Sequence, residues 1–200
     1  MPVLGITGGI ATGKTLFTEC LARFLPALRV FDSDRCAREL TASDPAILKA
    51  IRDQFGPGIF DATGVLQRPA LRAIVFADPL KRKALEAILH PAIRGAWLAL
   101  ARTIREQSGN PWLAVDIPLL FETSAQAHFD KIIVVACSTP TQRRRLMDIR
   151  HLSPGLAESM IASQLPLAEK IDRADFVVWN DGLPEALEVQ ARLLSLHLFS

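Results

Sequence analysis

The chain has 200 residues, of which 50% are hydrophobic, and its formal net charge is +2. This length and apolar content suit one α/β domain with a sizeable core and exclude an intrinsically disordered chain. The near-neutral charge gives no electrostatic case for binding nucleic acid or a membrane surface.

Neither the cysteines nor the apolar runs indicate a secreted or membrane protein. The three cysteines are widely spaced and form no CxxC pair, which argues against a disulfide framework or a zinc site. The N-terminus lacks signal-peptide features, and no apolar run approaches the about 20 residues that span a bilayer. We therefore expect a cytoplasmic protein with no membrane or nucleic-acid partner, and a monomer.

Strands and helices alternate along the chain. Short apolar or β-branched runs predict five strands, at 2–7, 29–31, 112–117, 131–137 and 176–179. Helical spacing or a leading proline predicts helices at 14–25, 34–40, 45–55, 69–76, 79–107, 139–149, 154–164 and 184–199. This alternation favours a five-stranded parallel sheet covered by helices on both faces.

The segment from Asp34 to Gln107 contains no good strand, which predicts a helical subdomain beside the sheet. Asp44 is a candidate N-cap for the second of its helices. The stretch 56–64 is dense in Gly, Pro and Asp and predicts a loop. Pro91 is expected to kink or break the last helix of this segment.

The strongest motif is the octapeptide 8–15, which fits G-x-x-x-x-G-K-[ST] between a predicted strand and a predicted helix. Glycines let the backbone curl so that N–H groups point at phosphate oxygens, and the helix N-terminus adds its positive dipole end. Lys14 is the cation for the β- and γ-phosphates, and the Thr15 hydroxyl is a hard oxygen ligand for Mg²⁺. The residues expected to bind ATP are Gly8, Gly9, Ala11, Thr12, Gly13, Lys14, Thr15 and Leu16.

Carboxylates follow two of the predicted strands, where ligands of open parallel sheets bind. Asp32 and Asp34 follow the second strand, and Asp116 closes the third in a pattern like a Walker B strand. Phosphoryl transfer to a hydroxyl needs an acid that accepts the proton or orients the acceptor. If strand geometry continues, Asp32 and Asp34 point in opposite directions, so only one of them faces the acceptor.

A basic helix follows the fourth strand and carries Arg143, Arg144 and Arg145, with Arg150 just beyond. In small P-loop kinases this region is a lid that supplies arginines to the transferring phosphoryl group. Adjacent arginines on a helix point to different faces, so at most one or two reach the site.

Taken together, these residues resemble the dephospho-coenzyme A kinase family over nearly the whole chain. Beyond the phosphate motif, the resemblance rests on ordered segments, namely 6–10, 32–34 with 37–39, 55–56, 64–68, 75–76, 88–91 and 116–122, with Leu71. It continues with Gln142, 145–147, Gln164, Lys170, 174–175 and 180–182. The His90–Pro91 pair and the run 118–122 are far more specific than the phosphate motif.

This resemblance implies ATP-dependent, Mg²⁺-supported phosphorylation of the ribose 3′-hydroxyl of dephospho-coenzyme A, the last step of coenzyme A synthesis. It also implies a core over about 1–33, 110–140 and 174–200, a helical acceptor-binding insertion over about 34–109, and a lid over about 141–173. The family's base maps to Asp34 and its lid arginine to Arg145. Its acceptor-side basic residues map to Arg68 and His90, beside Asp32 and Asp116.

The sequence departs from the family pattern at two places. Ala11 stands where a glycine is usual, which costs about 1 kcal/mol or more if the position needs a positive φ. A second lid arginine is expected four residues after the first, but Ile149 occupies that position and Arg150 follows it.

Two other functions fit parts of the sequence. Another small-molecule or nucleotide kinase would share the ATP-side residues and differ on the acceptor side. A non-catalytic nucleotide-binding protein would keep the phosphate motif without turnover, but the intact Lys14, Thr15, Asp34 and Arg145 argue against it. A GTPase is disfavoured because the chain has no N-K-x-D motif.

Overall fold

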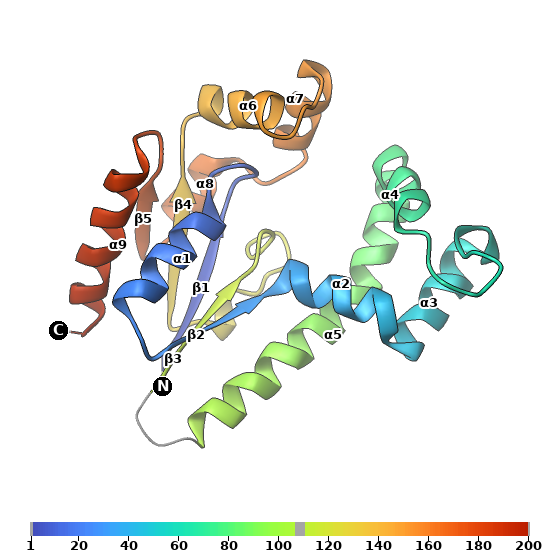
Figure 1. The fold of residues 1–200 in the computed structure, drawn as a ribbon, viewed down its shortest axis with the longest axis horizontal. Helices are drawn as coiled ribbons and strands as arrows, with labels where there is room; N and C mark the ends of the chain where they lie inside the picture. The colour runs from blue at the N-terminus through green and yellow to red at the C-terminus, as the bar shows by residue number, and fades with distance from the viewer. Residues whose placement is uncertain (1, 107–110, 200) are drawn as a thin grey trace. The chain divides into compact units, whose positions relative to one another are not determined.

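The chain forms a five-stranded parallel sheet (Figure 1), in a computed structural model that describes residues 2–106 and 111–199. Its spatial order is β2-β3-β1-β4-β5. The strands are β1 Val3–Gly8, β2 Leu28–Asp32, β3 Trp112–Asp116, β4 Lys131–Ala136 and β5 Phe176–Trp179. In register, Ile6 of β1 lies beside Asp116 of β3 and Ile133 of β4. The expected five-stranded parallel sheet is confirmed.

The helices agree with the sequence prediction to within a few residues, with two exceptions. Their bounds are α1 Lys14–Phe24, α2 Ser33–Ser43, α3 Pro45–Phe55, α4 Arg68–Ala77, α5 Pro79–Arg105, α6 Thr139–Asp148, α7 Pro154–Ala162, α8 Leu167–Asp172 and α9 Pro184–Phe199, with short 3₁₀ turns η1 Pro57–Ile59 and η2 Gln126–His128. The six-residue helix α8 was not predicted. The predicted helix end at Gln107 lies outside the described residues.

The second exception concerns Pro91, where a kink or a break was expected: α5 continues through the proline, so there is no break. A proline inside a helix removes one backbone hydrogen bond. Leu89 and Ala92, on either side of it, both pack against the apolar cluster around Ile51 and Leu71. This tertiary packing outweighs the local cost and keeps the helix continuous.

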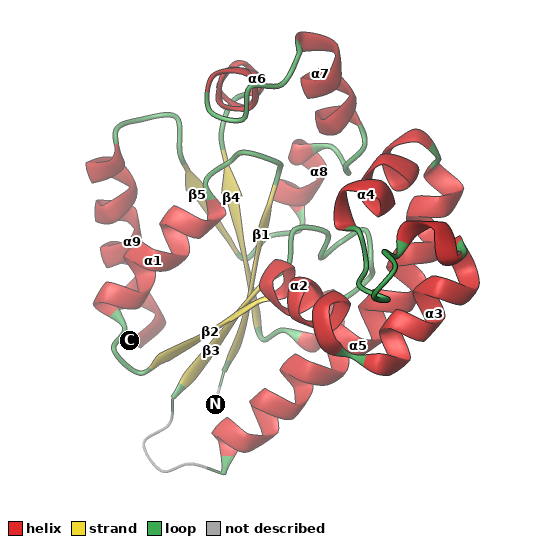
Figure 2. Ribbon diagram, turned by 45° about the vertical axis from the view of Figure 1, so that its right-hand side comes forward, coloured by secondary structure: helices red, strands yellow, loops and turns green. Residues whose placement is uncertain are grey.

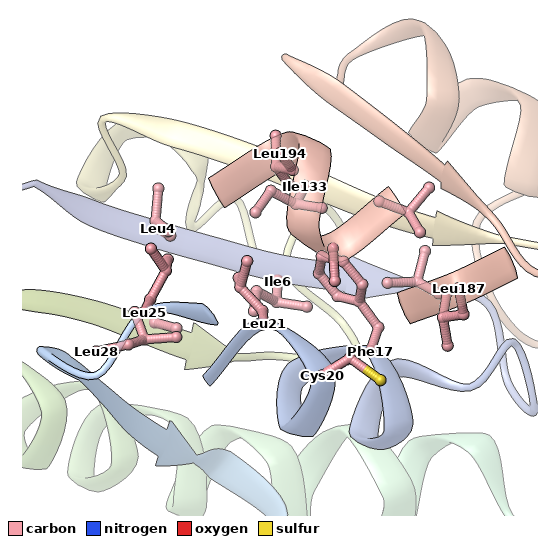
Figure 3. Packing of buried hydrophobic residues seen from close by; sticks show 14 of the residues in the cluster. Leu4, Ile6, Phe17, Cys20, Leu21, Leu25, Leu28, Ile133, Leu187 and Leu194 are labelled. Carbon is pink, nitrogen blue, oxygen red and sulfur yellow. The ribbon is translucent and has the colours of Figure 1, made fainter. Parts of the chain in front are cut away.

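The chain divides into two compact units, one of residues 1–31 and 103–200 and the other of residues 32–102. In the first unit, alternate residues of β4 enter two different cores. Ile133 and Val135 pack with Leu4, Phe17 and other residues of β1, α1 and α9 (Figure 3). Val134 packs instead with Leu120 and other residues that surround α8. Both faces of the sheet are therefore covered (Figure 2), as expected for parallel strands.

The second unit has an apolar core of its own, made by residues from α3, η1, α4 and their connections. Its buried members are Ile47, Ile51, Ile59, Phe60, Leu66 and Leu71. Asp44 caps α3 as predicted, because its carboxylate accepts from Ala46 N and Ile47 N at 2.9 and 3.0 Å. Within the described residues, no helix is both long and apolar enough to cross a membrane.

Candidate nucleotide-binding site

Residues 8–15, here called the phosphate loop, connect the carboxyl end of β1 to the N-terminus of α1. Gly13 is the residue before the helix and has a φ of 94°, a left-handed conformation that suits glycine. Ala11 also has a positive φ, of 59°. The departure noted at Ala11 therefore falls at a position where a side chain is strained.

Side chains from α6 and from the residue that follows β5 donate hydrogen bonds to carbonyl groups of the phosphate loop. Arg145 Nη1 donates to Ala11 O and Thr12 O, both at 3.2 Å, and Arg145 Nη2 donates to Asn180 O at 2.8 Å. Asn180 Nδ2 donates to Thr12 O at 2.7 Å. A side chain at Gly13 would place its Cβ 2.2 Å from Asn180 Nδ2, so only glycine allows this close approach.

Ile10 is held by two glutamines. Gln142 Nε2 donates to Ile10 O at 2.7 Å, and Ile10 N donates to Gln164 Oε1 at 2.8 Å. A Cβ at Gly9, an unspecified position of the motif, would lie 2.5 Å from Gln142 Nε2, so the bond of Gln142 to Ile10 favours glycine there. We call Gln142, Gln164, Arg145 and Asn180 the loop collar. With its carbonyls bonded outward, the loop can present backbone N–H groups to an anion.

The three residues at the start of α1 lie where the sequence predicted. Lys14 Nζ donates to Gly9 O at 3.3 Å, so its ammonium group lies across the phosphate loop. Thr15 and Leu16, in the first turn of the helix, are exposed. The helix N-terminus contributes positive dipole at the same place. This arrangement suits the phosphates of a nucleotide.

A buried lysine contacts the first residue of the phosphate loop. Lys170 of α8 is fully buried, and its Nζ lies 2.7 Å from Glu122 Oε1, 3.4 Å from Gly8 O and 3.3 Å from Pro118 O. Asp116 lies two residues before Pro118, at the carboxyl end of β3 beside β1. The lysine thus links the start of the phosphate loop to the segment that follows Asp116.

A second carboxylate organises the turn after β5. Asp181 Oδ1 accepts from Ser138 N at 2.9 Å and from Ser138 Oγ at 3.0 Å. Burial opposes ionisation, but these bonds prevail and lower the pKa of Asp181. Burial also raises the pKa of the nearby Cys137 thiol to about 11, so this cysteine is neutral and unsuited to nucleophilic chemistry.

The other arginines of the basic helix differ from Arg145. Arg143 pairs with Glu158 of α7, and Arg144 is exposed. The helix ends at Asp148, between Arg145 and Arg150, as the sequence allowed, and His151 then has a φ of 53°. Arg150 is exposed. Only Arg145 contacts the phosphate loop among the described arginines.

The predicted carboxylates Asp32 and Asp34 lie at the start of α2, so the strand geometry under which they would point in opposite directions does not continue to them. Asp32 is the N-cap: its Oδ1 accepts from Arg35 N at 2.9 Å, and its Oδ2 lies 3.9 Å from Arg38 Nη2. Helix begins at Ser33 because this cap satisfies an end N–H group. Asp34 is exposed in the first turn and makes no hydrogen bond or ion pair within the described part of the chain.

The predicted basic acceptor-side residues are also in the unit 32–102. Arg68 is exposed at the start of α4, and its Nη2 donates to Arg38 O. His90 is half-buried in α5, where burial lowers its pKa; Glu86 opposes this shift and Arg94 adds to it. The imidazole is therefore biased to its neutral form.

Sequence reasoning assigned no role to Gln142, Gln164, Lys170 or Asn180. Each bonds to backbone far away in the chain, and such contacts leave no local pattern. Their only signal was membership of the ordered set shared with the kinase family.

The residues present fit a magnesium ion bound together with a nucleotide. No group of three or more His, Cys, Asp and Glu residues in the described ranges could hold a metal. Magnesium typically takes only one or two protein ligands and completes its shell with phosphates and water. A threonine hydroxyl and an acidic residue at a strand end, Thr15 and Asp116, are ligands of the type it prefers.

Comparison with known proteins gives one consistent result. A family model described as dephospho-CoA kinase matches residues 2–185. Dephospho-CoA kinase of Anaeromyxobacter dehalogenans is 44% identical over 197 residues, which cover 98% of this chain and 92% of that protein. A crystal structure from Thermus thermophilus superposes with a TM-score of 0.78 at 31% identity, covering 99% of this chain and 96% of that one. Dephospho-CoA kinase from Campylobacter jejuni gives 0.69 at 26% identity, with coverage of 99% and 96%. The chain therefore belongs to the dephospho-CoA kinase family.

Proposed function

We propose that this protein transfers the γ-phosphoryl group of ATP to the ribose 3′-hydroxyl of dephospho-CoA, giving CoA and ADP. The observation that carries the proposal is the phosphate loop, held open by the loop collar, in a chain that belongs to this kinase family from residue 2 to residue 185. Both the ATP-side chemistry and the acceptor follow from this pairing of site and family.

On the donor side, the loop N–H groups and the N-terminus of α1 bind the phosphates of ATP. Lys14 neutralises charge on the β- and γ-phosphates. Thr15 and Asp116 would hold a magnesium ion bound with the nucleotide. The ion, when bound, offsets the charge of the phosphate oxygens.

On the acceptor side, Asp34 takes the proton of the attacking hydroxyl. The hydroxyl oxygen forms a bond to the γ-phosphorus, the bond to the β–γ bridging oxygen breaks, and the proton passes to the carboxylate. Asp34 is better suited than Asp32, because the Asp32 carboxylate is engaged with Arg35 N at the helix cap. A carboxylate in the first turn of α2 is also favoured by the helix dipole.

The role that we propose for Arg145 differs from that of a mobile lid arginine. Its guanidinium holds Ala11 O, Thr12 O and Asn180 O together. We assign it first to shaping the phosphate loop and second to lending positive charge to the phosphoryl group. A planar fork with five N–H donors suits such multiple bonding.

We assign acceptor binding to the unit 32–102. Arg68 offers an exposed cation for a phosphate group of dephospho-CoA. His90, biased to its neutral form, offers a hydrogen-bonding group rather than a charge. Asp32 supports Arg68 by fixing the start of α2, whose Arg38 O accepts from Arg68 Nη2. From the reaction, we place the protein in the cytoplasm.

The test is a coupled ADP-release assay with ATP, Mg²⁺ and dephospho-CoA, alongside AMP, adenosine and shikimate as alternative acceptors. We expect turnover with dephospho-CoA alone, and a product that returns to dephospho-CoA on treatment with a 3′-phosphatase. The folded Lys14→Ala variant is the inactive control. Preference for another acceptor would replace this function by that of a different P-loop kinase; tight ATP binding without turnover would indicate a non-catalytic protein.

A further inference from the structure

Both peptide groups of Ile10, its N–H and its C=O, are bonded to side chains from the two ends of the segment that contains α6 and α7. Gln142 lies in the first turns of α6 and is 3% exposed, and Gln164 follows α7. The two distances, 2.7 Å to Ile10 O and 2.8 Å from Ile10 N, are those of good hydrogen bonds. We call this arrangement the Ile10 clamp.

We propose that Gln142 and Gln164 are positioning residues, which hold the phosphate loop in its nucleotide-binding shape by docking the α6–α7 segment at both ends on Ile10. This inference rests on the proposed kinase function, because it assumes that the loop binds ATP phosphates. The inference goes further than that function, because it makes the shape of the phosphate loop depend on the α6–α7 segment that follows β4.

The two glutamines have opposite roles that the backbone fixes. An amide N–H can only donate, so the atom of Gln164 that faces Ile10 N is its oxygen. A carbonyl can only accept, so the atom of Gln142 that faces Ile10 O is its nitrogen. Glutamate would therefore preserve the bond of Gln164, whereas at position 142 it would set an anionic acceptor against a carbonyl.

The position of the Gln142 amide also restricts which residue can stand at position 9. A Cβ at position 9 would come within 2.5 Å of Gln142 Nε2. The Gln142 amide therefore lies in the space that a side chain at Gly9 would need. Loss of the Gln142 amide frees Ile10 O to turn toward the anion site, where a carbonyl oxygen would repel phosphate.

The chain provides a matched control at the edge of the sheet. Gln190 of α9 makes the same pair of bonds by itself, accepting from Trp179 N at 2.9 Å and donating to Trp179 O at 2.9 Å. These bonds lie on β5, an edge strand of the sheet. Gln190→Met therefore removes an equivalent donor and acceptor that make no bond to the phosphate loop.

The experiment measures ATP affinity by calorimetry in the absence of acceptor, together with the KM values and kcat for ATP and dephospho-CoA. Loss of one bond, at about 1 kcal/mol, corresponds to roughly a fivefold change in affinity. We expect Gln142→Met and Gln164→Met each to weaken ATP binding about fivefold or more, with the KM for dephospho-CoA unchanged. Gln190→Met should lower the Tm and leave the affinity for ATP unchanged.

A second comparison tests the assigned directions. In the thermal stability of the nucleotide-free protein, Gln164→Glu should be milder than Gln164→Met, and Gln142→Glu harsher than Gln142→Met. The double variant Gln142→Met/Gln164→Met should lose less than the sum of the single variants, because both act on one residue. If the Gln142 variants do not fold, the Gln164 pair alone decides.

Wild-type ATP affinity in folded Gln142→Met and Gln164→Met variants would overturn the inference and leave the glutamines with a structural role only. Equal losses of Tm in the Gln142→Glu and Gln164→Glu variants would overturn the inference as well, because the two glutamines would then not have opposite roles. Because ATP binding is measured without an acceptor, failure of the chain to phosphorylate dephospho-CoA would refute the proposed function and leave the clamp separately tested.

Discussion

Lys170 and Glu122 form an ion pair in which the lysine side chain is completely buried and the glutamate side chain is 21% exposed. The same ammonium group reaches Gly8 O and Pro118 O, and the same Glu122 oxygen accepts from Leu165 N at 3.0 Å. One charge pair therefore joins the start of the phosphate loop, the segment after β3, and the connection that leads into α8.

Replacing Lys170 by methionine should lower the free energy of unfolding by about 3 kcal/mol, because Glu122 loses its partner and Gly8 O and Pro118 O lose a buried donor. Urea unfolding at neutral pH measures the loss. Lys131→Met is the matched control, since Lys131 pairs with Asp175 at 2.9 Å with 49% and 34% of the side chains exposed. That exposed pair should contribute about 1 kcal/mol or less.

The double variant Lys170→Met/Glu122→Gln separates the two causes of this loss. If an unpaired Glu122 charge is responsible, neutralising it should recover a measurable part of the stability. No recovery would mean that the lysine acts mainly through the two backbone carbonyls.

Ala11→Gly should raise the stability of the folded protein by up to about 1 kcal/mol. The left-handed conformation at a φ of 59° costs an L-residue roughly 1–2 kcal/mol, and the greater freedom of glycine in the unfolded chain offsets part of the gain. Ala50→Gly, within α3, should instead lose about 1 kcal/mol. A loss at both positions would contradict the strain assigned to Ala11.

Hydrophobic patterning predicted the fold well because parallel strands buried on both faces form continuous apolar runs, as in β1 and β4. It failed at α8, which has only six residues and a proline, Pro166, at its N-cap without a side-chain bond. This helix owes its place to the burial of Lys170, a tertiary contact that no local pattern reveals. At Pro91 the opposite holds: the local signal allowed a kink or a break, and tertiary packing favours a helix that continues through the proline.

The site divides in the same way. Lys14 and Thr15 follow from the spacing of a contiguous motif, which local backbone geometry requires. The loop collar does not, because Gln142 and Asn180 reach loop carbonyls from 132 and 168 positions away. Asp32 and Asp34 show an intermediate case: their place after a strand singled them out, but the start of the helix at Ser33 determines how they are placed.

Asp34→Asn should reduce kcat by roughly 10²–10⁴-fold with little change in ATP affinity, because it removes the proposed proton acceptor. Asp32→Asn should be mild, since asparagine caps a helix about as well as aspartate and only the distant Arg38 contact is lost. Steady-state kinetics at saturating ATP and dephospho-CoA make the comparison. A crippled Asp32→Asn beside an active Asp34→Asn would reverse the two assignments.

His90 should make the protein less stable as the pH falls. Its pKa in the folded state is below the ordinary value of about 6.5, mainly because burial disfavours the charged imidazole. Between these two values the unfolded chain binds more protons, so the free energy of unfolding decreases as the pH drops through about 6.5. Urea unfolding of wild type and His90→Gln at pH 5 to 8 tests this. Parallel pH curves for the two proteins would contradict it.

Arg145→Ala should be the most harmful of the arginine substitutions, because it leaves the carbonyls of Ala11 and Thr12 without the Nη1 donor and removes positive charge from the phosphate loop. We expect turnover to fall on the order of 100-fold, with weaker ATP binding as well.

Arg145→Lys separates the two contributions of that arginine. Lysine keeps the charge, but its single ammonium group cannot reproduce a fork that reaches Ala11 O, Thr12 O and Asn180 O at once. If loop shape is the main contribution, Arg145→Lys should bind ATP almost as weakly as Arg145→Ala. If charge dominates, lysine should restore most of kcat. Arg143→Ala, which breaks only an exposed pair with Glu158, and Arg150→Ala are the controls and should stay near wild type. Small and equal effects at all three positions would remove Arg145 from the mechanism, because neither its bonds to the loop nor its charge would then contribute to transfer.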